Sequence, residues 1–117
     1  MTDKQGYLAM YDFLVGLWEI RKDQFDHDFP GLLGDMTLLE NGVPADAAQW
    51  YDWKECVPEA EITEAAAFDT MMCFLDNYRK RGEMEGAEIT QVINIITASP
   101  ETTREKWLAC VKRVLAE

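Results

Sequence analysis

The sequence predicts an all-α protein, built as one domain over residues 1–117 from six helices in two related three-helix halves. Apolar residues recur at i, i+3, i+4 and i+7 along most of the chain. Capping residues and prolines stand where these stretches begin. The length of 117 residues fits one domain, and a hydrophobic content of 48% is enough for a buried core.

The first helix is predicted from about residue 3 to residue 21. Thr2 can cap it, and Gln5 completes a capping-box pattern three residues later. One apolar stripe then follows the helix at three- and four-residue intervals. Its members are Tyr7, Met10, Tyr11, Leu14, Leu17 and Trp18. A polar connection over residues 22–28 separates this helix from the next.

The second helix is predicted to be short. Pro30 fits its first turn, because proline has no backbone N–H to lose there. Its apolar positions are Leu32, Leu33, Met36 and Leu39. The dipeptide Asn41-Gly42 then predicts a turn or a helix stop.

The third helix completes the first half, which spans about residues 1–58. Asp46 can cap its start, and its apolar face carries Trp50, Trp53 and Val57. Trp50 and Trp53 are three residues apart and share one helical face, which predicts that Trp53 fills the core. Pro58 ends the helix or follows it.

The second half, residues 62–117, is predicted to repeat this plan. Thr63 caps a fourth helix, and residues 82–86 form a loop. The fourth helix carries Phe68, Met71, Met72, Leu75 and Tyr78. The β-branched residues of the fifth segment favour a strand, but their spacing favours a helix. They are Ile89, Val92, Ile93 and Ile96. Ser99-Pro100 then opens a sixth helix with Trp107, Val111, Val114 and Leu115.

The two halves can be overlaid on one another. An offset of 61 places Tyr7 on Phe68, and an offset of 57 places Trp50 on Trp107. The difference between the offsets falls in a connection, where insertions are tolerated. Few paired positions are identical, so chance register between amphipathic helices is the alternative to an internal duplication. A duplication would give a pseudo-symmetric bundle of two three-helix units.

The charge of the chain is strongly negative and uneven. The formal net charge is −11 at pH 7. Residues 1–62 hold 13 acids and 4 bases, a net of −9, whereas residues 63–117 hold 9 acids and 7 bases, a net of −2. Such a field repels nucleic acid and anionic lipid, and it accelerates association with basic partners. The alternative is that the acidity serves solubility alone.

The cysteines and the N-terminus predict a cytoplasmic protein. The chain has three cysteines, an odd number, and none is in a CxxC pair. This argues against a disulfide framework and for a reducing compartment. No long apolar run suggests a signal peptide or a membrane span.

The sequence contains no convincing metal or cofactor motif. Its single histidine, His27, stands between Asp26 and Asp28, and these three side chains could offer ligands to a metal ion. Consecutive residues rarely point at one centre, however, and no second cluster of histidine or cysteine completes a site. A solvated loop is the favoured reading, so we predict no metal and no cofactor.

We also predict that the chain is not an enzyme and binds no nucleic acid. Nucleophilic catalysis needs a nucleophile, a base and an orienting group, which one histidine in an acidic loop supports poorly. The acids Asp12 and Glu19 fit a solvated helix face, and Cys110 sits in an apolar stretch that favours packing. The one dense basic run, residues 79–81, complements the dipole at a helix C-terminus.

The segment LLGDMTLLENGVPADAAQWYDW, residues 32–53, resembles a recurrent signature of small bacterial proteins. That signature usually follows a helix like residues 7–14. Such proteins are similar to immunity proteins of contact-dependent growth inhibition and other polymorphic toxin systems. The resemblance covers the first half well, but it reaches the second half only through residues 71–75 and Trp107. It marks a family and implies no catalytic residue.

A surface that mixes acids with aromatics suits protein binding, because aromatics anchor and acids steer. We therefore expect partner-binding residues along the acidic half, with Phe25 and Tyr51 as anchors. The expected set is Asp23, Phe25, Asp26, Asp28, Asp35, Glu40, Tyr51, Asp52 and Glu55.

The predicted function is that of an immunity protein that neutralises a cognate toxin domain, which we expect to be a basic nuclease. Its acids would occupy the place of nucleic-acid phosphate, with no membrane involved. The alternative is a non-enzymatic regulatory or structural helical module, as a monomer or a homodimer, with acidity serving only solubility.

Overall fold

The computed structural model describes residues 1–81 and 87–117, and this part of the chain is helical throughout its regular structure. The all-α prediction is therefore confirmed. The elements are α1 (Asp3–Arg21), the 3₁₀ turn η1 (Lys22–Gln24), α2 (Asp28–Met36), α3 (Ala48–Cys56), α4 (Glu64–Arg81), α5 (Ala87–Ala98) and α6 (Pro100–Ala116). The predicted loop 82–86 lies outside the described residues.

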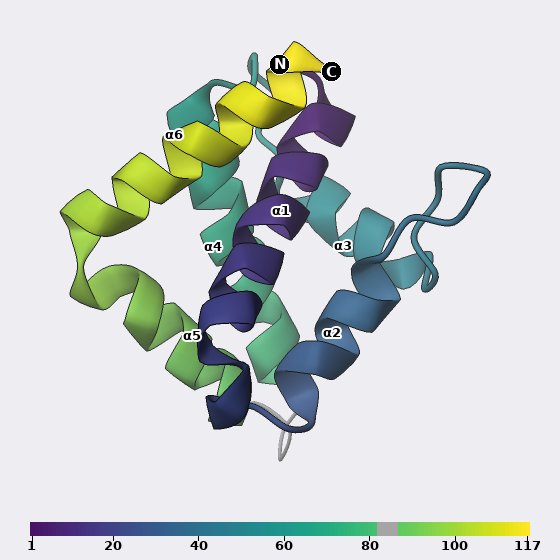
Figure 1. The fold of residues 1–117 in the computed structure, drawn as a ribbon. Helices are drawn as coiled ribbons and strands as arrows, with labels where there is room; N and C mark the ends of the chain where they lie inside the picture. The colour runs from purple at the N-terminus through teal and green to yellow at the C-terminus, as the bar shows by residue number, and fades with distance from the viewer. Residues whose placement is uncertain (82–86) are drawn as a thin grey trace.

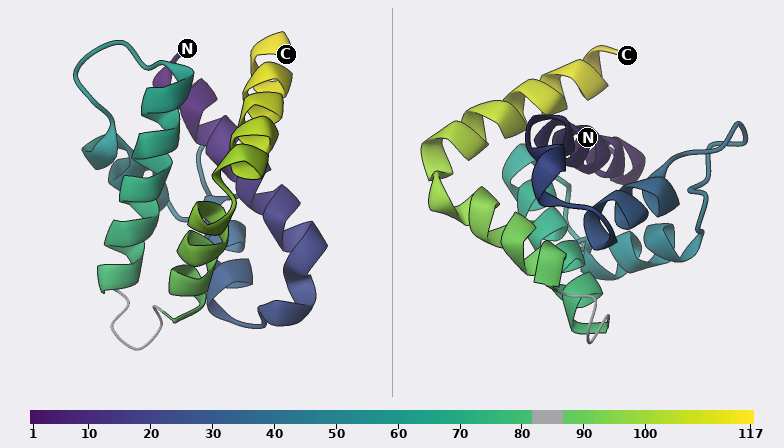
Figure 2. Two further views of the ribbon diagram at one scale, coloured as in Figure 1. Left: turned by 90° about the vertical axis from the view of Figure 1, so that its left-hand side faces the viewer. Right: turned by 60° about the horizontal axis from the view of Figure 1, so that its bottom comes forward.

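Two long helices, α1 and α4, pack against each other at the centre of the molecule, and the other helices surround them (Figure 1). α6 packs along α1, while α3 packs along α4. α2 and α5 lie against α1 and α4 respectively and also contact each other. The two ends of the chain lie at the same end of the molecule in both Figure 1 and the left view of Figure 2.

The helix starts agree largely with the capping residues of the sequence. The Gln5 backbone N–H donates to Thr2 Oγ1 at 3.1 Å, and the Thr2 N–H donates to Gln5 Oε1 at 2.8 Å, which completes the capping box. Thr63 Oγ1 accepts the Ala66 N–H at 3.1 Å at the start of α4. Ser99 occupies the N-cap position of α6, but its side chain makes no capping hydrogen bond.

The core is continuous across both halves. Its largest fully buried side chains include Tyr7, Trp53, Phe29 and Phe74, from α1, α3, α2 and α4. The β-branched segment that could have formed a strand is helix α5, and it buries Ile89, Val92 and Ile96. Trp53 is fully buried, as predicted.

α2 ends earlier than the apolar spacing predicts, so Leu39 does not belong to it. The helix stops at Met36, and Thr37 adopts an extended conformation with ψ of 130°. The Thr37 hydroxyl donates to the carbonyl of Leu33 on α2. It also hydrogen-bonds to the hydroxyl of Tyr11 on α1. Leu39 is 51% exposed as a result. Leu115, predicted on the apolar face of α6, is 45% exposed.

The prediction against disulfides is wrong, because Cys56 and Cys73 are bonded to each other. Cys56 ends α3 and Cys73 lies on α4, and the packing of these helices brings their Cα atoms to 5.9 Å. Cys110 is free and buried, and burial is the main cause that raises the pKa of its thiol to about 11. Its packing role therefore agrees with the sequence prediction.

The same tryptophan contact occurs in both halves. Trp53 Nε1 on α3 donates to the Asp3 carbonyl at 3.1 Å, and Trp107 Nε1 on α6 donates to the Glu64 carbonyl at 2.9 Å. Asp3 and Glu64 are the first residues of α1 and α4. These contacts pair Trp107 with Trp53, whereas the sequence overlay pairs it with Trp50. A duplication of two related halves stays a prediction.

Candidate functional site

A loop over residues 37–47 joins α2 to α3 and projects from the helices (Figures 1 and 2). A short antiparallel bridge pairs Leu38 with Pro44. The Leu39 N–H donates to the Val43 carbonyl at 2.7 Å, and the Gly42 N–H donates to the Leu39 carbonyl at 2.8 Å. Gly42 has a φ of 81°, a left-handed conformation that favours glycine. The Asn41-Gly42 turn is therefore confirmed, and the loop is closed by its own backbone.

The base of this loop is tied to α1 and α2. The Tyr7 hydroxyl donates to the Met36 carbonyl at 3.0 Å. The Asp46 N–H donates to the Asp35 carbonyl at 3.0 Å, and the Ala45 N–H donates to the Thr37 carbonyl at 2.8 Å. Burial is the main cause that raises the pKa of Tyr7 above its usual range. These bonds hold the loop in one position relative to the helices.

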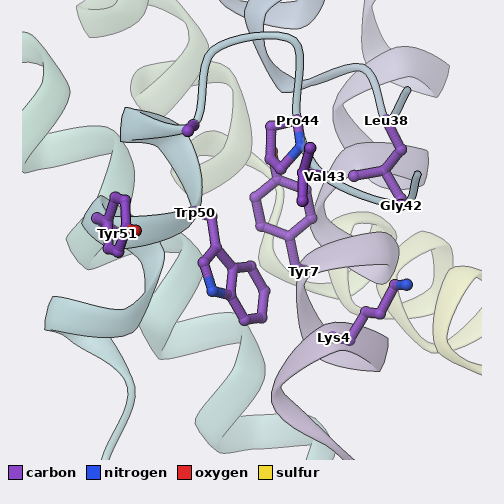
Figure 3. Close-up of a pocket in the computed structure, with 9 residues that line it drawn as sticks. Lys4, Tyr7, Leu38, Gly42, Val43, Pro44, Trp50 and Tyr51 are labelled. Carbon is purple, nitrogen blue, oxygen red and sulfur yellow. The ribbon is translucent and has the colours of Figure 1, made fainter. Parts of the chain in front are cut away.

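A small pocket lies between the loop, α1 and α3. It has a volume of about 180 Å³ and is mostly apolar. In Figure 3, the Tyr7 ring lies next to Pro44 and Val43, with Trp50 beside it. The Tyr7 and Trp50 rings meet edge to face, with centroids 5.7 Å apart. Lys4 forms the rim near Gly42.

Large apolar side chains are exposed around this pocket. Leu39 is 51% exposed, Val43 45% and Tyr51 67%. Val43 and Tyr51 line the pocket, and Leu39 is hydrogen-bonded to Val43 in the same turn. We call these three residues the apolar rim. Leu39 and Val43 lie on the loop and Tyr51 on α3, and of the three only Val43 and Tyr51 line the pocket. Exposed large apolar side chains on adjoining segments are typical of interaction surfaces, whereas single ones need no explanation.

Acidic side chains border the apolar rim. Glu40 and Asp46 are exposed on the loop, and Asp35 is half-buried at the end of α2. Burial, and then the charge of Asp46, raises the pKa of the Asp35 carboxyl. Within the described part of the chain none of these three carboxylates has an ion-pair partner. A cation brought by a partner would therefore be attracted to them.

The expected partner-binding residues divide between two places. Asp35, Glu40, Tyr51, Asp52 and Glu55 lie on the end of α2, on the loop or on α3. Asp23, Asp26 and Asp28 lie at the opposite end of α2, around η1. One compact patch therefore does not contain the whole expected set.

The structure contradicts one expected anchor, Phe25. This side chain is 3% exposed and packs edge to face on Phe29, with centroids 5.0 Å apart. The η1 turn causes this, because the Phe25 N–H bonds to the Lys22 carbonyl and the chain then reverses toward the core. Phe25 is a core residue and cannot serve as a surface anchor in this structure.

Two of the expected acids are already paired with bases. The two terminal guanidinium nitrogens of Arg81, Nη1 and Nη2, donate to the Asp52 carboxylate at 2.7 and 2.6 Å. The Asp52 contact is the largest cause of the raised pKa of Arg81, and the charge of Glu55 adds to it. Asp28 Oδ1 lies 2.7 Å from His27 Nδ1. The Asp52 carboxylate therefore presents less free charge than the sequence suggests, and Asp28 is engaged by a neighbouring ring nitrogen.

Sequence reasoning missed Leu39, Val43 and Lys4 as surface residues of this site. Leu39 was assigned to a helical stripe, although the Asn41-Gly42 turn two residues later was a signal that the chain had left the helix. Val43 and Lys4 carried no local signal, because only the packing of the loop over α1 brings them together.

The described residues contain no group of three or more side chains placed to hold a metal ion, including the loop around His27. No helix in residues 1–81 or 87–117 is long and apolar enough to cross a membrane. Comparison of the chain with protein-family models, with curated proteins and with solved structures finds no match.

Proposed function

We propose that this chain is an inhibitory binding protein, an immunity protein that neutralises a basic toxin domain through the loop 37–47 and α3. The observation that supports this most is the apolar rim of Leu39, Val43 and Tyr51. Beside it lie the acids Asp35, Glu40 and Asp46, which form no ion pair within residues 1–81 and 87–117. It would act without catalysis, by covering the active cleft of its partner. The Cys56–Cys73 disulfide removes the cysteine argument for a reducing compartment, so the proposal does not depend on the cytoplasm.

Rigidity supports an inhibitory role. The loop is closed by backbone hydrogen bonds and tied to α1 and α2, so little conformational entropy is lost when a partner covers it. The apolar rim then supplies the buried contacts that dominate binding energy, while the acids steer a basic partner into place. The net charge of −11 adds a long-range attraction for such a partner.

The resemblance of residues 32–53 to immunity proteins points to the same surface. Those residues form the second part of α2, the loop and most of α3. Their glycine and proline positions shape the loop, through Gly42 in its left-handed conformation and Pro44 in the bridge. The signature therefore coincides with the candidate surface.

The proposal predicts that a large secreted protein with a toxin-like C-terminal domain is encoded immediately upstream of this gene, and that domain is the partner to test. Co-expression of the full chain is expected to rescue growth from that domain. Replacing the apolar rim (Leu39→Ser, Val43→Ser, Tyr51→Ser) is expected to weaken binding at least about 100-fold, as loss of a hot spot does. The matched control is Ile20→Ser with Leu115→Ser, which removes exposed apolar side chains elsewhere.

Charge is tested separately from the apolar rim. Glu40→Lys is expected to slow association, and Glu105→Lys on α6 is the control with the same change in net charge. Association should also slow steeply as salt rises to about 1 M, where the Debye length is about 3 Å. Failure to rescue growth, or association that is insensitive to salt, would count against the proposal. If the chain formed a homodimer that the apolar-rim variant dissociated, the result would favour the alternative, a regulatory or structural helical module.

A further inference from the structure

The second half carries an open groove that the proposed function does not use. It lies between α4, α5 and α6 and has a volume of about 530 Å³, within the range of about 300–1,000 Å³ typical of small-molecule sites. Its apolar lining includes Phe68, Ile96, Trp107 and Leu108. Phe68 and Trp107 meet edge to face, with centroids 5.7 Å apart, and form an aromatic wall.

The polar groups of the groove divide into two kinds. The hydroxyl of Thr103 donates to the Ile96 carbonyl at 2.8 Å, and that of Thr97 donates to the Ile93 carbonyl at 3.0 Å. Trp107 Nε1 is likewise committed, to the Glu64 carbonyl. The uncommitted polar groups are therefore charged side chains on the walls.

These charges are of both signs and come from different walls. Glu64 and Asp69 lie on α4, and Arg104 lies on α6. All three are exposed, and none forms an ion pair within residues 1–81 and 87–117. A ligand that bridges the two walls would meet carboxylates on one side and a guanidinium on the other.

We propose that this groove binds a free α-amino acid with an apolar side chain. The ligand's ammonium group faces Glu64 and Asp69, its carboxylate faces Arg104, and its side chain contacts the aromatic wall. A ligand with a single charge can pair with the charged side chains of only one wall. The second half has a net charge of −2, so its long-range field favours neither a cation nor an anion strongly. The proposal is independent of the proposed function, because it uses other helices.

The test is titration of the ¹⁵N-labelled full chain with L-phenylalanine, followed by amide chemical shifts. A small ligand of this size is expected to bind with a Kd of about 1 mM. Shifts should concentrate in the lining segments, residues 64–69, 96–97 and 100–108. Two analogues, 2-phenylethylamine and 3-phenylpropionate, each lack one charge and are expected to bind about tenfold more weakly.

Arg104→Gln separates charge recognition from apolar binding. It is expected to reduce the affinity for L-phenylalanine to that for 2-phenylethylamine, while leaving the affinity for the amine unchanged. Lys106→Gln, also exposed on α6 but outside the groove, is the matched control and should change neither. Equal affinity for all three ligands would overturn the proposal in favour of a purely apolar cavity. Absence of shifts in the groove at about 10 mM ligand, ten times the expected Kd, would overturn it altogether.

Discussion

The two halves of the molecule use the same tryptophan contact but offer different surfaces. In the first half, the loop 37–47 covers the space beside Tyr7 and leaves a pocket of about 180 Å³. In the second half, Ser99 alone joins α5 to α6, and a groove of about 530 Å³ stays open beside Phe68. The comparison teaches that helix packing holds each half together. The length of the connection before its last helix, residues 37–47 in the first half and Ser99 in the second, decides which surface that half presents.

The largest expected effect comes from removing the tryptophan of either half. Trp53→Ala and Trp107→Ala should each lower the free energy of unfolding by about 3–5 kcal/mol, because each leaves a cavity and removes the hydrogen bond from the indole N–H to a helix carbonyl. Trp53 is enclosed, whereas Trp107 borders the groove, where water can enter. Trp53→Ala should therefore cost more, as measured by urea denaturation. If Trp107→Ala lowered the free energy of unfolding as much as Trp53→Ala or more, the open groove would have no effect on the stability that Trp107 contributes.

The disulfide sharpens the comparison, because it links α3 of the first half to α4 of the second. Cys56→Ser with Cys73→Ser should lower the free energy of unfolding by about 3 kcal/mol, the value expected for a bond across 17 residues. Thermal denaturation measures the change. Reduction of the unmodified chain should reproduce it, and reduction of the double variant should have no further effect. A reduced chain as stable as the oxidised one would contradict the prediction.

Gly6 tests how closely α3 approaches α1 in the first half. A Cβ at Gly6 would lie 2.9 Å from Cζ2 of the fully buried Trp53 ring. Gly6→Ala gains about 1 kcal/mol of helix propensity, but overpacking costs about 1–3 kcal/mol. We expect a net loss of up to about 2 kcal/mol in urea denaturation.

Gly16→Ala is the matched control for this prediction. Gly16 lies on the same helix with open space around it, so the change should raise stability by up to about 1 kcal/mol. A gain at Gly6 as large as the gain at Gly16 would show that Trp53 yields easily, and that the first half is packed less tightly than the distance implies.

The smallest expected effect contrasts an unpaired acid of the first half with a paired acid of the second. The pKa of Asp35 is raised, so its ionisation costs stability at neutral pH, and this cost is relieved as pH falls toward 3.8. The pKa of Asp76 is lowered, first by Lys80 and then by Arg79, so its contribution is present at neutral pH and lost as pH falls below 3.8.

Substitution of these two acids should therefore have opposite signs. At pH 7, Asp35→Asn should raise the free energy of unfolding by less than about 1 kcal/mol, and Asp76→Asn should lower it slightly. Both differences should shrink in acid, where urea denaturation of the three proteins is to be compared. The same sign for both variants would mean that Asp35 has a partner cation after all.

Much of the fold was predictable from residues close together in sequence. The capping box at Thr2, the cap at Thr63 and the periodic apolar stripes predicted where helices begin and which faces are buried. The burial of Trp53 followed from its place on such a stripe. The end of α2 was predicted too late, because the apolar stripe continued to Leu39 after the backbone had already turned.

The candidate site was predictable only in outline. The sequence singled out residues 32–53, which form the end of α2, the loop and most of α3, and Tyr51 is exposed there. Their binding role stays a prediction. Phe25 was misplaced, because the direction of an aromatic ring after a 3₁₀ turn depends on what the turn packs against. The pairing of Asp52 with Arg81 was also invisible, since 29 residues separate them.

The amino-acid sequence by itself determined the helical class, the helix starts, the single core and the strong negative charge, because these depend on local periodicity, capping and composition. Only the tertiary structure decided which cysteines bond, which acids are neutralised and where a pocket or groove opens. Those properties depend on contacts between residues distant in the chain, and small shifts in how helices pack change them entirely.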